Sequence, residues 1–282
     1  MRILVTGGAG RLGYSVSRQL VENGQTVRVF DLPQVDWSHV ERLGVEAFKG
    51  DITDQGSVTD ACKDVDAVVH LAALLPPRSE SSRELTMKVN VSGTENILNS
   101  INSDTPIVLT SSISTYGITA NAKPPINETY PQTPHNNYSK SKISAEKVVM
   151  DAGNPTSILR IAPISVADLV ELPDSIPYRS DQRVEFIFVD DAACAIVISL
   201  KVCDDREIYN IAGGKSWQMT GTEYIDRFYA ALGVEVEPVF SEEYTAVDWY
   251  DTEKGERLGY QRTSFNQLEK KLEVLGMEMG LR

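Results

Sequence analysis

The sequence predicts an α/β protein built on a doubly wound parallel sheet, with a small lobe toward its carboxyl end. Short apolar runs rich in β-branched residues alternate with longer segments in which apolar residues return every three or four positions. This alternation is typical of a parallel sheet covered by helices. A glycine-rich stretch between the first apolar run and the first helical segment points to the same class of fold.

Seven short apolar runs are predicted as strands because turn residues bound them. They are residues 3–6, 26–30, 45–49, 67–71, 107–110, 157–161 and 208–211. Between them, four segments have the helical period. They are residues 12–23, 55–62, 83–101 and 137–151.

The regular alternation ends after residue 161. A polar, proline-containing stretch, 163–182, is predicted as a loop, and a strand-like run, 184–189, leads into a further helical segment. Thr220 and Glu223 form a capping box, which predicts a helix that ends at Gly233, and a last helix is predicted after Ser264. The expected plan is a sheet-based domain of residues 1–162, which 184–211 rejoins, and a small lobe made of 163–183 and 212–282.

Composition and charge limit the class of protein. The chain has 282 residues, 41% hydrophobic and 24% charged, which excludes disorder and fibres. A net charge of −13 would repel a phosphate backbone, so nucleic acid is not an expected partner. The chain runs from Met1 directly into an apolar run, and its longest apolar stretch, 192–200, is much shorter than the about 20 residues of a membrane helix. We therefore expect a cytoplasmic protein without membrane contact, and Cys62, Cys194 and Cys203 fit reduced packing residues.

The glycine-rich stretch predicts a dinucleotide site. Gly7, Gly10 and Gly13 lie three residues apart between a predicted strand and a predicted helix. Glycines there permit a tight turn and close approach to a diphosphate, while the helix start offers free N–H groups and a partial positive charge. Asp31 ends the second predicted strand, where a carboxylate accepts both ribose hydroxyls and repels a 2′-phosphate, so NAD is favoured over NADP. Arg11 faces either the diphosphate or solvent.

A second group of residues indicates proton transfer. Tyr138 and Lys142 stand one turn apart on a predicted helix. A phenol with a pKa of about 10 is a poor base near neutrality, and an adjacent ammonium favours its phenolate. Such a pair alone is weak evidence, because it also occurs on solvated helix faces. Ser112 strengthens it, since it ends the fifth predicted strand and sites in parallel sheets form beyond such ends.

With these residues in chain order, the sequence resembles the extended short-chain dehydrogenases/reductases, the NAD-dependent epimerase/dehydratase family that includes UDP-galactose 4-epimerase. The resemblance covers nearly the whole chain. Besides the glycine stretch and Tyr138-x-x-x-Lys142, the matching motifs are Gly50-Asp51-Ile52, His70-Leu71-Ala72-Ala73, Asn90-Val-x-Gly93-Thr94, Ser112-x-x-x-Tyr116-Gly117 and Phe188-Val-Asp-Asp-Ala192.

The resemblance implies that the larger domain is an NAD-binding Rossmann domain and that the lobe binds substrate. It implies hydride transfer at the nicotinamide, with Tyr138 as acid/base, Lys142 lowering the pKa of Tyr138 and holding the ribose, and Ser112 hydrogen-bonding the reacting oxygen. Asn90 would steady the helix that bears these groups. The implied cofactor contacts are Gly7, Gly10, Arg11, Leu12, Gly13, Asp31, Asp51, Ile52, Leu71, Ala72, Ala73, Asn90, Tyr138 and Lys142.

Two further expectations concern metals and assembly. His39, His70 and His135 are isolated and lack the spacing of metal ligands, so no metal is predicted and His70 is interpreted as structural. Similar enzymes pair through the helices after the fourth and fifth strands. The resemblance therefore implies a homodimer through 83–101 and 137–151.

Departures from the family pattern narrow the reaction. Ile113 and Ser114 stand where the family's 4,6-dehydratases carry an Asp-Glu pair, so dehydration is not expected. The arginines and the asparagine that clamp a nucleotide-sugar diphosphate are also missing from their expected positions, which should weaken such a substrate. Arg78, Arg179 and Arg183 are candidate replacements, and Ser112 and Ser114 are further candidate substrate contacts.

Three functions stay open. The first is a 4-epimerase-like, NAD-dependent oxidoreductase acting on a secondary alcohol or ketone of a sugar or sugar nucleotide, with no net change in the cofactor. The second is a net dehydrogenase or reductase of a smaller sugar acid or hydroxy acid, which would form stoichiometric NADH. The third, an NAD-sensing binding protein, is disfavoured because Tyr138 and Lys142 are both present.

Overall fold

The computed structural model describes residues 1–168, 173 and 175–282. At its centre is a parallel sheet of seven strands in the order β10-β6-β5-β4-β1-β2-β3. These strands are β1 (Arg2–Thr6), β2 (Thr26–Asp31), β3 (Glu46–Lys49), β4 (Ala67–His70), β5 (Ile107–Ser112), β6 (Thr156–Ile161) and β10 (Glu207–Ile211). The doubly wound fold is confirmed, and the strand order reverses between β1 and β4, where ligands bind in sheets of this kind.

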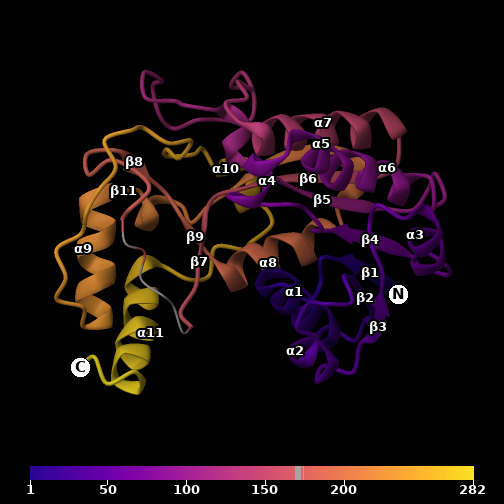
Figure 1. Ribbon diagram of the computed structural model, residues 1–282, viewed down its shortest axis with the longest axis horizontal. Coiled ribbons are helices and arrows are strands. Elements are labelled where there is room, and N and C mark those ends of the chain that lie inside the picture. The colour runs from indigo at the N-terminus through magenta and orange to yellow at the C-terminus, as the bar shows by residue number, and fades with distance from the viewer. Residues whose placement is uncertain (169–172, 174) are drawn as a thin grey trace.

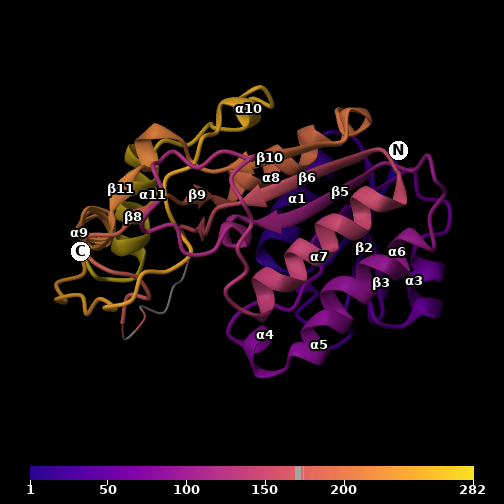
Figure 2. The same ribbon diagram turned by 90° about the horizontal axis from the view of Figure 1, so that it is seen from above.

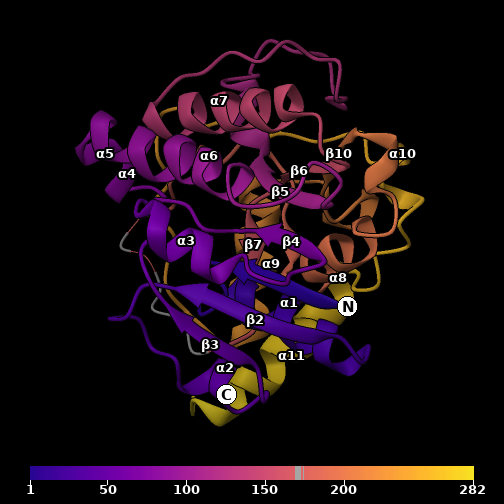
Figure 3. The ribbon, with the colours of Figure 1, turned by 90° about the vertical axis from the view of Figure 1, so that its right-hand side faces the viewer.

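Helices cover both faces of the sheet (Figures 1 and 3). One face carries α3 (Gln55–Ala61), α5 (Arg83–Met87), α6 (Gly93–Leu98) and α7 (Asn137–Ala152). The other carries α1 (Arg11–Glu22) and α8 (Val189–Ser199), which pack against each other. Side chains of β1 alternate between these layers, since Ile3 and Val5 join the core under α1 and α8, whereas Leu4 joins the core under α3, α6 and α7.

The predicted helix 83–101 is not regular. It consists of α5, a π-helix from Lys88 to Ser92, and α6. Asn90 lies in the π-helix, a form that is frequent at functional sites. The predicted helix 137–151 is found as α7, which begins with a capping box between Asn136 and Ser139 and ends at Gly153 in a left-handed conformation.

The small lobe lies at the end of the molecule toward which the sheet strands point, as Figures 1 and 2 show. Its helices α9 (Gly221–Leu232) and α11 (Phe265–Glu278) pack together around an apolar core that includes Trp217 and Phe265. The predicted capping box of Thr220 and Glu223 is present, α9 is followed by Gly233 as its C-cap, and the predicted last helix does follow Ser264, which is its N-cap.

The prediction of one strand over 184–189 is wrong. The run contains β8 (Arg183–Val184), which pairs with β11 (Met219–Thr220), and β9 (Ile187–Phe188), which pairs with β7 (Ile164–Ser165). Between them the buried Glu185 accepts hydrogen bonds from the backbone N–H groups of Gly214 and Tyr250, at 2.8 and 2.9 Å. The chain therefore passes from one small sheet to the next and returns to the main sheet only through α8 and β10.

Short helices complete the described part of the chain. They are α2 (Ser38–Glu41), α4 (Arg78–Ser81), α10 (Glu253–Glu256) and the 3₁₀ turns Ile113–Tyr116, Cys203–Asp205 and Lys215–Trp217. The predicted loop 163–182 contains β7 and a bridge from Ile176 to Phe240, while 169–172 and 174 fall outside the described residues. No helix among the described residues has the length and apolar character needed to cross a membrane.

Candidate functional site

The glycine-rich turn lies where the strand order of the sheet reverses. Gly7 adopts a φ of 67°, and a Cβ at this position would stand 2.8 Å from the backbone nitrogen of Ala72. A Cβ at Gly13 would stand 2.5 Å from the carbonyl oxygen of Gly7. The packing of the chain itself therefore requires glycine at these two positions.

Gly10 differs, because a Cβ there would meet only the carbonyl oxygen of Gly7, at 3.5 Å. It is the N-cap residue of α1, and no side chain caps this helix and no acidic residue lies in its first turn. The first N–H groups of a helix have no partners within the helix and favour an anion. The space that glycine leaves open at residue 10 thus fits the diphosphate of a dinucleotide.

The predicted adenosine contacts lie at the ends of neighbouring strands. The Asp31 carboxylate accepts hydrogen bonds from the N–H groups of Ala9, at 3.0 Å, and Leu32, at 2.8 Å. Asp51 and Ile52 follow β3, and Gly50 joins them to β2 through an N–H bond to the Asp31 carbonyl oxygen, at 2.9 Å. The structure therefore brings Asp31, Asp51 and Ile52 to one edge of the sheet.

The segment after β4 is held by Thr6, the last residue of β1, and by Asn90. Leu71 and Ala72 donate their N–H groups to the carbonyl and hydroxyl oxygens of Thr6, at 3.1 and 3.2 Å, and Ala73 follows them. The buried Asn90 accepts from the N–H of Leu74, at 2.6 Å, and donates to the Leu74 carbonyl, at 3.1 Å, and to the Ser141 hydroxyl, at 2.8 Å. Both amide hydrogens of Asn90 are thus used inside the protein, and none is left for a cofactor.

His70 is buried between two hydroxyls. Its Nδ1 lies 2.7 Å from Thr6 Oγ1 and its Nε2 lies 2.9 Å from Thr94 Oγ1. Burial, with the nearby charge of Lys142, lowers the pKa of His70 to about 3. The ring is therefore neutral and joins β1, β4 and α6.

The structure brings Ser112, Tyr138 and Lys142 together. Ser112 is the last residue of β5, and its hydroxyl accepts the N–H of Ser114 at 3.2 Å. Tyr138 and Lys142 project from the first turns of α7, with the Lys142 ammonium 5.7 Å from the centre of the Tyr138 ring. The same ammonium donates to the Thr110 carbonyl oxygen at 2.8 Å.

The pKa of Tyr138 is raised, contrary to the lowering that the resemblance implies. Burial raises it to about 12, against the effect of a hydrogen bond with Ser112. Burial also lowers the pKa of Lys142 to about 8, against the opposite effect of Glu146. Desolvation is the larger effect on both groups, so in the protein alone the phenol is protonated at neutral pH.

A buried ion pair supports the helix that bears these groups. Glu146 accepts from Nε and Nη2 of Arg160, at 3.0 and 2.7 Å, and from the Ser111 hydroxyl, at 2.5 Å. The side chains of the pair are only 4% and 6% exposed. Sequence reasoning missed Glu146, although its position four residues after Lys142 places it on the same helix face.

Two of the candidate substrate residues, Arg179 and Arg183, are already bound to carboxylates of the protein. Arg179 holds Asp181 through two hydrogen bonds of 2.7 Å, and Arg183 holds the buried Asp248 at 2.6 and 2.9 Å. These guanidinium groups are already engaged with carboxylates, which argues against a role in binding a diphosphate.

Arg78 and Ser114 differ from these two arginines, because their side chains have no partner among the described residues. Arg78 is exposed in α4, and its guanidinium makes no hydrogen bond or ion pair within the described part of the chain. Ser114 Oγ is buried and has no hydrogen-bond partner there. Arg11 is exposed at the start of α1 and its guanidinium lies 3.4 Å from the Asp168 carboxylate, while the neighbouring Leu12 packs on the core.

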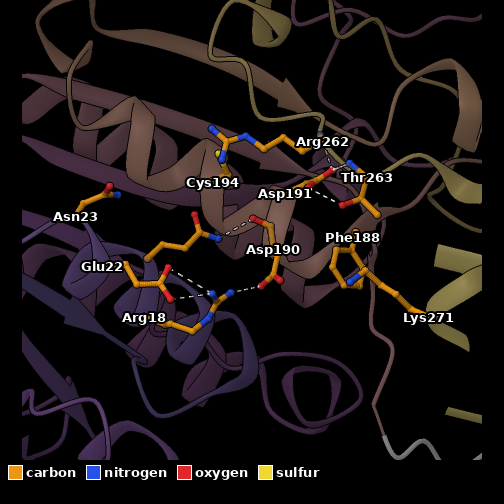
Figure 4. Close-up of a pocket in the computed structure, with 11 residues that line it drawn as sticks. Arg18, Glu22, Asn23, Phe188, Asp190, Asp191, Cys194, Arg262, Thr263 and Lys271 are labelled. Atoms are coloured by element: carbon orange, nitrogen blue, oxygen red, sulfur yellow. Dashed lines mark hydrogen bonds and ion pairs between the residues drawn. The ribbon is translucent and has the colours of Figure 1, made fainter. Parts of the chain in front are cut away.

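Near the small lobe, a recess of about 330 Å³ lies between α1, α8 and α11, and Figure 4 shows its lining. Asp190 accepts from the Ser15 hydroxyl, at 2.5 Å, and from Arg18, at 2.8 Å, while Asp191 accepts from the N–H of Thr263, at 2.8 Å. The recess includes none of the candidate catalytic residues. Through Asp190 and Asp191, the start of α8 is thus bound both to α1 and to the segment that precedes α11.

These features define the class of protein as a doubly wound α/β protein with a dinucleotide turn and a Ser, Tyr and Lys group at the carboxyl end of its sheet. Comparison with family models makes the assignment more specific. The model described as the 3-beta hydroxysteroid dehydrogenase/isomerase family matches residues 4–161, more than half of the chain, so the protein belongs to that family.

Individual relatives include both sterol and sugar enzymes. The chain is 33% identical over 154 residues to sterol-4-alpha-carboxylate 3-dehydrogenase, decarboxylating, of Mus musculus, covering 54% of this chain and 41% of that protein. It is 34% identical over 154 residues to UDP-glucose 4-epimerase of Lactobacillus helveticus, covering 53% and 46%. The chain thus spans less than half the length of either of these curated relatives.

A solved structure resembles the whole chain. It is the UDP-glucose-4-epimerase of Stenotrophomonas maltophila with bound NAD and formylated UDP-arabinopyranose, which matches with a TM-score of 0.83 and 24% identity over 99% of both chains. The similarity supports the same fold.

Proposed function

We propose that the protein is an NAD-dependent oxidoreductase that transfers hydride at a secondary alcohol or the corresponding ketone. The observation that carries the proposal is the meeting of Ser112, at the end of β5, with Tyr138 and Lys142 on α7. NAD is the cofactor, and its proposed position is supported by the space beside Gly10 for the diphosphate and by the Asp31 carboxylate at the end of β2 for the ribose hydroxyls. In this proposal residues 1–162 and 184–211 bind NAD, and 163–183 with 212–282 bind substrate.

The proposed roles follow from the chemistry of the three side chains. NAD supplies the acceptor or donor of hydride when bound. The protonated Tyr138 phenol, the form that burial favours, donates its proton to a ketone oxygen during reduction. In the oxidising direction the phenol must first lose this proton, which the neighbouring Lys142 ammonium favours. Ser112 orients the reacting oxygen by a hydrogen bond.

Two substrate classes are proposed. The first is a sugar or sugar nucleotide whose alcohol is oxidised and then reduced on the other face, as in a 4-epimerase. The second is a smaller compound without a diphosphate, oxidised or reduced with net change of NAD. The ion pairs Arg179–Asp181 and Arg183–Asp248 favour the second, because they occupy two of the three arginines that were candidates for holding a diphosphate.

The test compares the wild type with Tyr138→Phe. The purified protein is incubated with NAD and one class of substrate at a time: sugar nucleotides, sugar acids, hydroxy acids or sterol carboxylates. The absorbance of NADH and the epimer ratio are followed in each incubation. We expect the wild type to turn over one of these classes and Tyr138→Phe to lose at least about a hundredfold of that rate. NAD affinity, measured by calorimetry, should stay the same, because the phenol is absent from the diphosphate turn.

Unchanged turnover in Tyr138→Phe would exclude the proposed acid/base role. NADH formed in proportion to substrate would identify a dehydrogenase, and an altered epimer ratio without NADH would identify an epimerase. Tight NAD binding with no turnover of any class would favour the binding-protein alternative.

A further inference from the structure

Glu80 makes a contact with the proposed catalytic helix that the mechanism above does not use. It lies in α4, the short helix between β4 and α5, and Figure 2 shows α4 beside the amino-terminal end of α7. Its carboxylate accepts the backbone N–H of Asn137 at 2.9 Å and that of Tyr138 at 3.1 Å. It also accepts the Ser79 hydroxyl at 2.9 Å. One carboxylate thus binds two consecutive peptide groups of the first turn of α7.

These bonds complete the N-terminus of α7. The Asn136 side chain accepts only the N–H of Ser139, at 2.8 Å, and the two N–H groups before it have no partner within a helix. Glu80 supplies both partners from a distant segment. Burial alone would raise the pKa of Glu80, but the N–H groups of Asn137 and Tyr138 and the Ser79 hydroxyl hold it below its usual value, so the carboxylate is ionised.

The carbonyl side of Tyr138 is linked to the same segment. The Ser141 hydroxyl donates to the Tyr138 carbonyl oxygen at 2.7 Å and accepts from Asn90 at 2.8 Å. Asn90 in turn binds both backbone groups of Leu74. The segment between β4 and α5 therefore holds the backbone of Tyr138 at its N–H, through Glu80, and at its carbonyl, through Asn90 and Ser141.

We infer that Glu80 is a positioning residue for Tyr138: it docks the segment after β4 onto α7 and fixes the direction in which the helix presents the phenol to Ser112. The inference rests on the proposed function. Glu80 acts through the backbone of Tyr138, with its carboxylate bound to the N–H of that residue. A displacement of about 1 Å at a reacting group can cost a hundredfold in rate, so this docking has a large effect on turnover.

The helix does not need Glu80 in order to form. It has 16 residues, its own capping box at Asn136 and Ser139, and a left-handed Gly153 at its end. Loss of Glu80 should therefore change the placement of α7 more than its existence. This distinction makes the inference testable.

The experiment uses Glu80→Gln, with Glu84→Gln as the matched control. Glutamine keeps the size of the side chain but offers one acceptor oxygen in place of two, so one of the two N–H groups of α7 loses its partner. Glu84 lies in the next helix, is exposed, and its side chain makes no hydrogen bond or ion pair within the described ranges 1–168, 173 and 175–282. Both variants remove one negative charge from the same region.

With the substrate identified above, Glu80→Gln should lower kcat at least about tenfold and leave the Kd for NAD and the melting temperature within error of the wild type. Glu84→Gln should leave all three unchanged. An unchanged kcat in Glu80→Gln overturns the inference. So does an equal loss in both variants, or a loss of kcat accompanied by a matching loss of folding stability.

Hydrogen exchange separates this inference from the proposed function. At least one of the amides of Asn137 and Tyr138 should exchange faster in Glu80→Gln than in the wild type or Glu84→Gln, whereas amides at 145–152 should not change. Equal exchange in all three proteins overturns the docking, whatever the reaction. If the wild type turns over no substrate but the exchange differs as expected, the docking stands and the proposed function fails.

Discussion

Gly10 and Gly13 lie on the same turn, but the space around them differs. A Cβ at residue 13 would collide with the Gly7 carbonyl at 2.5 Å, whereas at residue 10 the nearest atom is 3.5 Å away. Glycine at residue 13 is therefore explained by the fold. The fold does not explain glycine at residue 10, and we propose that a ligand approaching the start of α1 does.

This difference predicts distinct effects of two alanine substitutions. Gly10→Ala should keep a melting temperature near the wild type and lower NAD affinity at least about tenfold, because the methyl group occupies the space of the diphosphate. Gly13→Ala should lower both, with about 1–3 kcal/mol lost from the free energy of unfolding through overpacking. Calorimetric NAD titration and urea unfolding measure the two quantities, and Gly56→Ala, where a Cβ meets nothing closer than 3.7 Å, is the control. Normal NAD binding by Gly10→Ala would show that the cofactor does not contact this turn.

At the scale of single residues, the sequence predicted those site residues that lie close to one another along the chain. Tyr138 and Lys142 lie one turn apart, and Gly7, Gly10 and Gly13 lie within seven residues. The contact of Glu80 with Asn137 and Tyr138 was not predictable, because it joins residues 57 and 58 positions apart through backbone N–H groups, which leave no mark in side-chain identity. The raised pKa of Tyr138 also escaped prediction, since it depends on burial.

Among the elements, α7 is joined to the sheet by a buried charge pair. Glu146 of this helix and Arg160 of β6 are almost fully buried and bound to each other, with Ser111 beside them. Removing one partner of such a pair leaves an uncompensated charge in the interior. The pair therefore fixes α7 to β6, and the Ser111 hydroxyl links Glu146 to β5, the strand that ends at Ser112.

We expect Arg160→Met to lower the free energy of unfolding by about 3–5 kcal/mol. Glu269→Gln, which removes one partner of the partly exposed pair Arg227–Glu269, should cost no more than about 1 kcal/mol. Urea unfolding of both variants provides the comparison. Similar small losses in the two would mean that the buried pair contributes no more than a surface pair.

Two predicted elements were broken in ways that local pattern does not reveal. The prediction of one helix over residues 83–101 missed the π-helix at Lys88–Ser92, because apolar residues return every three or four positions along the whole segment and do not mark where a turn widens. The run 184–189 has the composition of a strand, but its two halves pair with β11 and β7, which are distant in sequence. The strands with which each half pairs, more than the strand propensity of its residues, therefore determine how the run 184–189 folds.

For the whole molecule, the parallel sheet was predictable because each of its strands is a separate apolar run and helices separate consecutive strands of the sheet. The lobe was not predictable in detail, because its sheets are made of pairs of two-residue strands. Whether the chain forms a dimer depends on which side chains its surface exposes, and the sequence pattern alone does not show this. The implied interface helices α5, α6 and α7 lie side by side on one face, as Figure 3 shows.

We predict a homodimer formed through these helices. Light scattering should give twice the 31.1 kDa mass of one chain. Leu85 of α5 is 45% exposed, and Leu85→Glu should shift the protein to a monomer because a charge would enter the interface. Val274→Glu, at a 54% exposed position of α11, should leave the mass unchanged. The prediction is wrong if the wild type is a monomer, or if Val274→Glu dissociates the dimer and Leu85→Glu does not.

The π-helix at Lys88–Ser92 constrains how the chain can vary in length. Deleting one residue from it would restore an ordinary α-helical turn and rotate α5 by about 100° relative to α6. The segment that carries Glu80 precedes α5 and would be carried away from α7 by the same rotation. The number of residues in this turn therefore affects the placement of Glu80 as well as that of Asn90. Sequence alignments of the family should treat a gap here as a change in the geometry around Tyr138.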